Sequence, residues 1–184
     1  MSVRGSMVGR DADLARMSEA LAGPSRWSTL FGPAGVGKSR IARELAGHGV
    51  WVDVSGSRTA GQLEHAVGRQ LEIEAIDDFA QAIAVKGALL IVLDDCESLD
   101  ANARRSISGW LGTAPGLRIL ATSREIMGEP EERVIALGPL DLPSSKALFL
   151  DRALKARGQP IEAGPALDAL LPRLDGLPLA IELA

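Results

Sequence analysis

The amino-acid sequence predicts an α/β fold, in which helices cover a parallel β-sheet and a small helical subdomain follows. Three observations support this prediction. Short apolar segments alternate with helical patterns over residues 1–140. Residues 88–93 form a continuous apolar run, which is typical of a strand buried on both faces of a parallel sheet. Beyond Leu140 the strand signals stop, and only helical patterns remain.

The expected strands are short segments rich in apolar residues. They lie at residues 26–32, 49–56, 88–95, 118–124 and 132–140. The helices expected around them lie at residues 8–23, 38–46, 59–86 (broken near 76–78) and 102–111. In the first helix, Leu14, Met17 and Leu21 recur at helical spacing. Because strands alternate with helices, we expect right-handed crossovers between parallel strands.

The chain is expected to divide into two parts. Residues 1–140 would form the sheet domain, and residues 141–184 the helical subdomain. Three helical stretches, separated by Gly and Pro, are expected in the second part at residues 144–157, 165–174 and 177–184. Because the last apolar helical pattern has no terminating signal, we expect the sequence to be a piece of a longer protein.

The charge balance argues against direct binding of nucleic acid. The net charge is −4 and the pI about 5.3, and the longest run of basic residues is the pair Arg104 and Arg105. A domain that grips DNA phosphates usually carries a basic stripe. We therefore expect no direct nucleic-acid contact from this chain.

Targeting signals are also missing from the sequence. The longest apolar run is far shorter than a membrane span, and no signal-peptide pattern begins the chain. The single cysteine, Cys96, cannot form an internal disulfide. The sequence therefore predicts a cytoplasmic protein without membrane contact.

A phosphate-binding loop is the strongest motif. Residues 32–39 match the pattern G-x-x-x-x-G-K-[ST] without a mismatch, between an apolar strand and a helix. The loop consists of Gly32, Pro33, Ala34, Gly35, Val36, Gly37, Lys38 and Ser39, and Arg40 follows as a further nucleotide-binding candidate. Its backbone N–H groups and the helix start would cradle phosphates. We expect Lys38 to reach the β- and γ-phosphates and the Ser39 hydroxyl to bind Mg²⁺. The motif predicts a nucleoside triphosphate and Mg²⁺ as cofactors.

An acidic pair ends the apolar strand at residues 88–95. The carboxyl edge of a parallel sheet is where ligands bind in open α/β folds. We expect Asp94 to hold Mg²⁺ through its water shell and Asp95 to orient or deprotonate an attacking water.

Few other side chains in the sequence are candidates for a chemical role. Arg124 ends the next strand and could contact a γ-phosphate, although a solvated strand-end arginine is the plain alternative. His48 and His65 are isolated, without a second ligand at metal spacing. Cys96 follows the acidic pair and is interpreted as a packing residue.

Five segments occur in a characteristic order: VGRDADL, GPAGVGKS, LLIVLDD, ILATSR and GLPLAIELA. In this order they resemble the STAND class of P-loop NTPases, which is related to the AAA+ ATPases. That class includes the NB-ARC domains of plant disease-resistance and apoptotic proteins, and bacterial transcriptional regulators of related build. The resemblance covers nearly the whole chain, and residues 8–10 and 176–180 are its most specific elements.

The resemblance implies a P-loop NTPase three-layer sandwich, whose five-stranded parallel sheet has the order 5-1-4-3-2. It implies that Val8, Gly9 and Arg10 line the adenine pocket and that Pro178 closes it from the helical subdomain. Arg124 would be the sensor of the γ-phosphate. The class also carries a winged-helix part that supplies a His toward the β-phosphate. That part would begin after Ala184, so a lock made by it is not expected to operate in this chain.

The functional expectation is an ATP/ADP-binding switch with slow or conditional hydrolysis, from a larger bacterial-type regulator. In the similar proteins ADP holds a closed resting form, and exchange for ATP allows self-association. The main alternative is an AAA+-like ATPase that remodels DNA or protein in a ring, with Arg104 or Arg105 as the arginine finger. A small-molecule kinase, and a scaffold that binds ATP without hydrolysis, also remain open, whereas no guanine-reading N-K-x-D stretch occurs.

Overall fold

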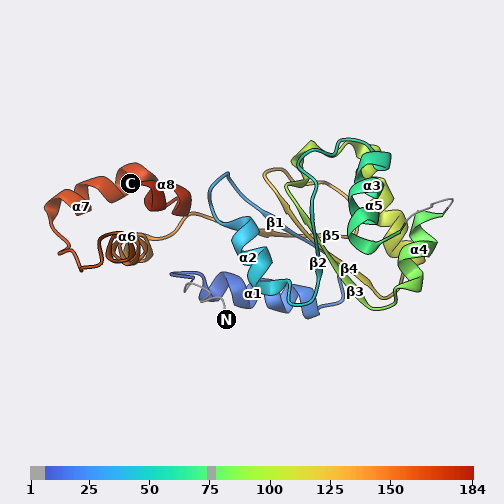
Figure 1. Ribbon diagram of the computed structural model, residues 1–184, viewed down its shortest axis with the longest axis horizontal. Helices are drawn as coiled ribbons and strands as arrows, with labels where there is room; N and C mark the ends of the chain where they lie inside the picture. Colours follow the sequence, from blue (N-terminus) through green and yellow to red (C-terminus); the bar gives the residue numbers. More distant parts are fainter. Residues whose placement is uncertain (1–6, 74–77) are drawn as a thin grey trace.

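The computed structural model describes residues 7–73 and 78–184 of the chain. Within these residues, parallel strands form a five-stranded sheet (Figure 1). The strands are β1 (Trp27–Phe31), β2 (Val50–Asp53), β3 (Leu89–Asp94), β4 (Leu117–Ser123) and β5 (Glu132–Ala136). Their order across the sheet is β2-β3-β4-β1-β5 and every neighbouring pair is parallel, which confirms the expected order 5-1-4-3-2.

Helices cover both faces of the sheet (Figure 1). On one face lie α1 (Asp11–Ala22) and α2 (Lys38–Leu45); on the other lie α3 (Ala60–Leu71), α4 (Phe79–Val85) and α5 (Ala101–Thr113). Residues 59–86 form two helices, because Thr59 caps the start of α3 and Asp78 caps the start of α4. Most of the break expected at residues 76–78 lies outside the described residues. None of the helices in the described part of the chain is long and apolar enough to span a membrane.

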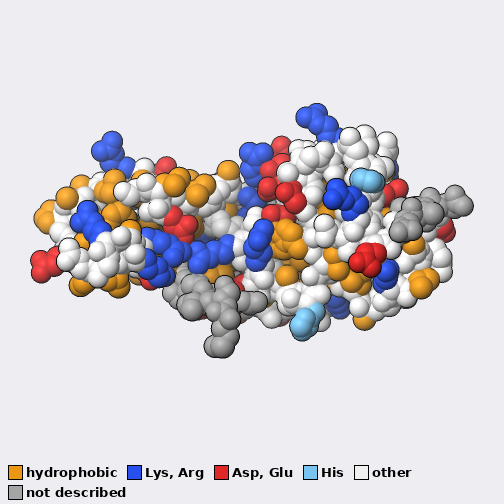
Figure 2. Space-filling model, in the orientation of Figure 1, with side chains coloured by type: hydrophobic (Ala, Val, Ile, Leu, Met, Phe, Trp, Pro, Cys, Tyr) orange, Lys and Arg blue, Asp and Glu red, His pale blue; other side chains and the backbone are white. Residues whose placement is uncertain are grey.

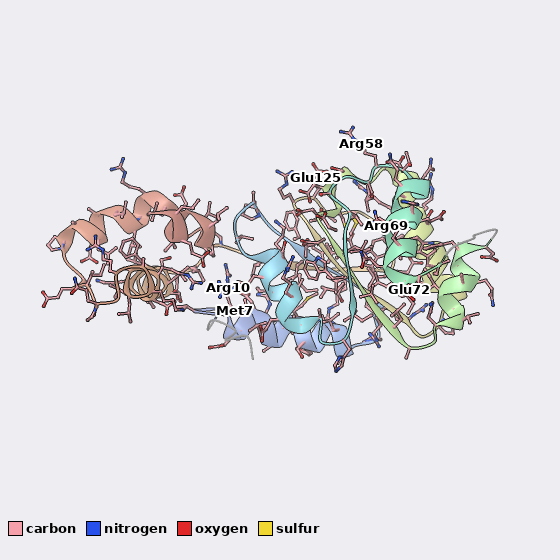
Figure 3. All side chains as sticks on the ribbon, in the orientation of Figure 1. Met7, Arg10, Arg58, Arg69, Glu72 and Glu125 are labelled. Carbon is pink, nitrogen blue, oxygen red and sulfur yellow. The ribbon has the colours of Figure 1, made fainter. Side chains whose placement is uncertain are left out.

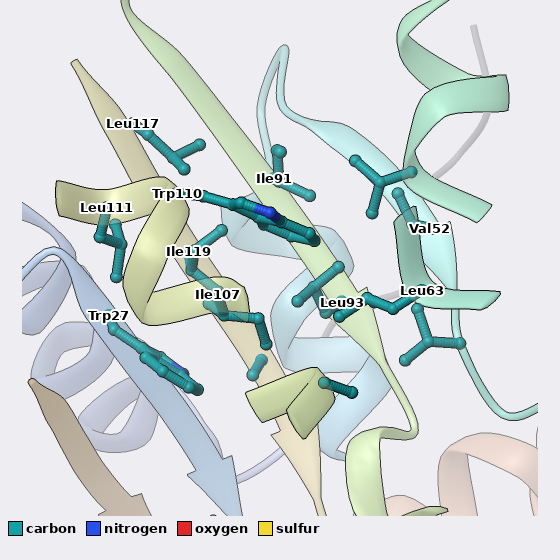
Figure 4. Packing of buried hydrophobic residues seen from close by; sticks show 14 of the residues in the cluster. Trp27, Val52, Leu63, Ile91, Leu93, Ile107, Trp110, Leu111, Leu117 and Ile119 are labelled. Carbon is teal, nitrogen blue, oxygen red and sulfur yellow. The ribbon is translucent and has the colours of Figure 1, made fainter. Parts of the chain in front are cut away.

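The burial of β3 on both faces explains its continuous apolar sequence. Ile91 and Leu93 point into the core under α3, α4 and α5, where Trp110 and Ile119 also pack (Figure 4). Val92, between them, points into the opposite core under α1 and α2. Because successive side chains of a strand face opposite sides, a strand between two cores needs apolar residues at every position.

A helical subdomain follows β5 and lies at the left end of the molecule in Figure 1. It consists of α6 (Leu142–Arg157), α7 (Pro165–Leu170), the short 3-10 helix η2 (Leu171–Leu174) and α8 (Pro178–Leu183). The stretch expected as one helix over residues 165–174 is thus two elements, and Pro172 lies inside the second of them. α6 begins two residues before the expected start at residue 144, because Asp141 caps it and Pro143 suits a first helical turn. Leu140, Leu148 and Ile181 form a small core of their own.

Candidate nucleotide-binding site

The topology brings the sequence motifs to one edge of the sheet. β4 lies between β1 and β3, and all three strands are parallel, so their carboxyl ends meet. The phosphate-binding loop follows β1, the acidic pair ends β3, and Arg124 directly follows β4. The three motifs are therefore neighbours in space, at the edge where open α/β folds bind ligands.

The phosphate-binding loop depends on its glycines. Gly37 caps α2 with a φ of 102°, a left-handed conformation that side chains with a Cβ rarely adopt. A Cβ at Gly32 would overlap the carbonyl oxygen of Leu137, which follows β5. The loop can thus lie against the chain after β5 only because residue 32 has no side chain.

Lys38 lies inside the loop, where it is almost fully buried. Its Nζ donates hydrogen bonds to the carbonyl oxygens of Gly32 at 2.9 Å and Pro33 at 3.0 Å. Burial lowers the pKa of Lys38 from its ordinary value, although the carboxylates of Glu97 and Asp95 act in the opposite direction. The ammonium group is therefore held by the loop that a phosphate chain would enter.

Thr122 organises the acidic end of β3, a role that the sequence did not reveal. Its hydroxyl donates to Asp94 Oδ1 at 2.6 Å and accepts the backbone N–H of Asp95 at 3.0 Å. Asp95 has a φ of 63°, so the chain leaves the strand conformation at this residue. Burial, followed by the nearby carboxylates of Asp94 and Glu97, raises the pKa of Asp95 above its ordinary value. A raised pKa makes a carboxylate a better proton acceptor.

A cleft of about 440 Å³ joins these groups to the helical subdomain. It is lined by Ala34, Gly35, Gly37, Lys38, Ser39, Arg40, Asp95, Glu97, Arg124, Pro178, Leu179 and Glu182. Its volume falls in the range of small-molecule sites, about 300–1,000 Å³. Of the acidic pair, Asp95 lines the cleft, whereas Asp94 does not line it and is almost fully buried.

Arg124 forms an ion pair that the sequence did not predict. Its Nε lies 2.6 Å from Oε1 of Glu97, on the short 3-10 helix η1 (Cys96–Ser98). The Arg124 side chain is 57% exposed, whereas that of Glu97 is only 14% exposed. Glu97 lies close to the acidic pair in the sequence, but a single carboxylate at such a position has no pattern that identifies its partner.

The residues expected around adenine lie between the phosphate-binding loop and the helical subdomain. The Arg10 guanidinium is buried and donates to Val36 O at 2.8 Å, Gly138 O at 2.9 Å and the Asp13 carboxylate at 2.8 Å. Figure 3 shows Arg10 between α2 and the helical subdomain. A Cβ at Gly9 would overlap the Ser144 side chain, so Gly9 packs against α6.

A second cavity, of about 30 Å³, lies between the loop and the helical subdomain. It is lined by Met7, Val8, Arg10, Val36, Gly37, Arg40, Leu140, Leu148 and Pro178. This volume is far below the about 300–1,000 Å³ of typical small-molecule sites. A purine base could enter only if the surrounding elements move apart.

The helical subdomain contacts the helix that follows the phosphate-binding loop. Glu182 of α8 pairs with Arg40 of α2 at 3.1 Å and with Arg152 of α6 at 2.7 Å. Basic side chains gather at this junction between the two parts (Figure 2). Neither Glu182 nor Arg152 could be singled out from the sequence, since each is an ordinary charged residue on a helix.

The cleft is not lined by the two arginine-finger candidates, Arg104 and Arg105, or by Cys96. Arg104 donates to the carbonyl oxygens of Leu99 and Met127, and Arg105 to the Asn102 side chain. Cys96 is completely buried, and burial raises the pKa of its thiol far above the ordinary value. Among the described residues, no group of three or more His, Cys, Asp or Glu could hold a metal ion.

Comparison with known sequences finds similar mycobacterial proteins. No protein-family model matches the chain. An uncharacterized protein of Mycobacterium tuberculosis is 34% identical over 197 residues, covering 97% of this chain and 50% of the relative. A second M. tuberculosis protein, whose name describes it as a candidate HTH-type transcriptional regulator, is 33% identical over 90% of this chain and 20% of its own length. The chain therefore spans half or less of the length of these relatives.

Solved structures identify the class of fold. A Walker-type ATPase of Pyrococcus abyssi has a TM-score of 0.68 at 15% identity, over 97% of this chain and 67% of that one. Cdc6p of Pyrobaculum aerophilum has a TM-score of 0.65 at 17% identity, over 97% and 60%. A STAND protein with a tetratricopeptide repeat sensor from Pyrococcus horikoshii has a TM-score of 0.64 at 19% identity, over 98% and 30%. The chain has the fold of the P-loop ATPases.

Proposed function

We propose that the chain is an ATP/ADP-binding switch module with slow or conditional hydrolysis, from a larger STAND-type regulator. The observation that carries this proposal is the cleft in which the phosphate-binding loop, Arg124 and α8 meet. A ligand bound there would touch both the sheet domain and the helical subdomain. The fold likeness to a STAND protein and a relative named as a candidate transcriptional regulator support the same assignment.

The residues have separate roles in this proposal. Phosphate and nucleotide binding is assigned to the loop from Gly32 to Ser39, to Arg40, and, around adenine, to Val8, Gly9, Arg10 and Pro178. Lys38 would bind the β- and γ-phosphates, and Asp95 would orient the attacking water. The oxygens of Ser39 and Asp94 fit Mg²⁺, which prefers few protein ligands and keeps several waters. Bound Mg²⁺ would neutralise charge on the phosphates.

In this proposal the chain divides into residues 1–140 and 141–184, and the second part moves relative to the first. Because the second cavity is small, we infer that a base enters it when the helical subdomain shifts. Nucleotide binding would then change the position of that subdomain, with the hinge at residues 138–143. Self-association of the ATP-bound form is part of this proposal.

The free energy of the sensor interaction favours a conformational switch over an ATP-driven motor. One charge-assisted contact between Arg124 and a γ-phosphate is worth about 1.5–3 kcal/mol. That free energy changes the equilibrium constant between two conformations by about ten- to a hundred-fold. Such a change shifts the populations of the two conformations without converting one completely into the other.

The nucleotide bound to the purified protein tests this function. The chain is purified without added nucleotide and denatured, and the released ligand is identified. Near-stoichiometric ADP is expected for a resting switch. Lys38→Ala should abolish binding of added ADP and ATP, whereas Lys86→Ala, which changes an exposed lysine after α4, should not. If Lys38→Ala binds ADP and ATP with unchanged affinity, the assignment of the phosphate-binding loop as the nucleotide site is wrong.

The alternative of a ring-forming ATPase shares the same cleft, and likeness to Cdc6p is the observation that favours it. An arginine finger must reach a neighbouring subunit, but Arg104 is bonded to backbone carbonyls of its own chain. Steady ATP turnover above about one per second would favour this alternative.

A further inference from the structure

Glu97 holds Arg124 at two points. Its Oε1 accepts a hydrogen bond from Arg124 Nε at 2.6 Å, and its Oε2 accepts the backbone N–H of Arg124 at 3.4 Å. Both residues line the cleft that also contains Lys38. The guanidinium is thus bonded to a carboxylate at the place where a γ-phosphate would approach.

The carboxylate of Glu97 is charged in this arrangement. Burial acts to raise its pKa, but hydrogen bonds from the backbone and from Arg124 outweigh burial, and the pKa lies below its ordinary value. Because Glu97 is mostly buried and Arg124 is exposed, the arginine is the partner that can move.

We propose that Glu97 is a positioning residue that competes with the γ-phosphate for Arg124 and so sets the ratio of ATP to ADP affinity. This inference rests on the proposed nucleotide site. A γ-phosphate that reaches Arg124 must displace Glu97 or lie beside its negative charge, and both weaken ATP binding. ADP lacks this phosphoryl group, so its binding leaves the pair intact.

The proposal predicts opposite effects for the two partners. Glu97→Gln removes the competing charge at nearly the same size, and should tighten binding of a non-hydrolysable ATP analogue about ten-fold, the equivalent of one charge-assisted hydrogen bond. Affinity for ADP should stay within about two-fold of the original protein. Arg124→Ala should weaken binding of the ATP analogue about ten-fold or more and spare ADP.

A double-mutant cycle distinguishes competition for Arg124 from a general electrostatic effect of the Glu97 charge on the site. Glu97 is also close enough to Lys38 to act on it electrostatically. That influence persists when Arg124 is removed, whereas competition for Arg124 does not. In the Arg124→Ala background, Glu97→Gln should therefore change the ATP-to-ADP affinity ratio much less than it does when Arg124 is present.

The experiment is calorimetric titration of the 184-residue chain with ADP and with the ATP analogue, in Mg²⁺ buffer. Glu125→Gln is the matched control, because Glu125 is the next residue after Arg124, is exposed (Figure 3), and loses the same charge. Glu97→Asp, which keeps the charge on a shorter side chain, should give an intermediate ratio. Circular dichroism checks that each variant is folded.

The outcomes separate this inference from the proposed function. If the original chain binds neither nucleotide, both are wrong. If it binds both nucleotides and Glu97→Gln leaves their affinity ratio unchanged, only this inference is wrong. An equal effect of Glu97→Gln with and without Arg124 would also overturn competition.

Discussion

The backbone N–H of Leu179 donates a hydrogen bond to the carbonyl oxygen of Gly35 at 3.1 Å, so the first turn of α8 rests on the phosphate-binding loop. A Cβ at Gly35 would lie 3.0 Å from the Cβ of Leu179, tighter than ordinary contact allows. The two backbones can approach because residue 35 is a glycine. A change of loop conformation on nucleotide binding would therefore alter this contact and the position of α8.

Gly35→Ala should damage both the loop and this contact. The φ of Gly35 is 75°, where alanine is strained, and a substitution of this kind costs about 1–3 kcal/mol. We expect lower stability in urea unfolding and weaker nucleotide binding. Gly109→Ala is the control: Gly109 lies inside α5 with open space around it, and alanine there should stabilise the helix by up to about 1 kcal/mol. Similar effects of the two changes would contradict the strain argument.

Thr122→Val should disorganise the acidic pair without changing the size of the side chain. It removes the donor to Asp94 and the acceptor for Asp95, both in a buried place. Loss of such partners costs about 1–3 kcal/mol of unfolding free energy. We also expect a higher Mg²⁺ concentration for half-maximal nucleotide binding, measured by titration. Thr113→Val, at the exposed end of α5, should change neither quantity.

Small-angle scattering should detect movement of the helical subdomain. Profiles with ADP and with a non-hydrolysable ATP analogue are expected to differ, because only the latter brings a γ-phosphate to Arg124. Lys38→Ala, which should not bind either nucleotide, serves as the control and should give one profile in all conditions. Superimposable profiles of the original chain would show that the linker at residues 138–143 is not a hinge.

Cys96 should be inert in the folded protein. The thiol is 0% exposed, and its pKa lies far above the ordinary value because of burial, followed by the carboxylates of Asp94 and Glu97. The thiolate is the reactive form, so iodoacetamide at pH 8 should not modify native protein and should modify it fully in guanidinium. An Ala101→Cys variant, with its new thiol at an exposed position, should react at once at that position. Rapid alkylation of native Cys96 would mean that the region around η1 opens readily.

The strands were largely predictable because their signals are local. The continuous apolar run at β3 identified a strand between two cores, and the glycines of the loop marked the end of β1. Helix ends were less predictable: the stretch at residues 165–174 became α7 and η2, and α6 started at Leu142 because Asp141 caps it. Such boundaries depend on single side-chain hydrogen bonds, which periodicity does not report.

The alternation of strands and helices and the phosphate-binding loop follow from contiguous residues, so the sequence was enough to predict both. The partners of Arg124 and Arg10, and the contact of α8 with the loop, depend on how the chain folds. Glu97 and Arg124 are 27 positions apart, and Arg10 and Gly138 are 128 apart. Groups so distant in the sequence meet only when the chain folds, and local patterns carry no information about which groups then face each other.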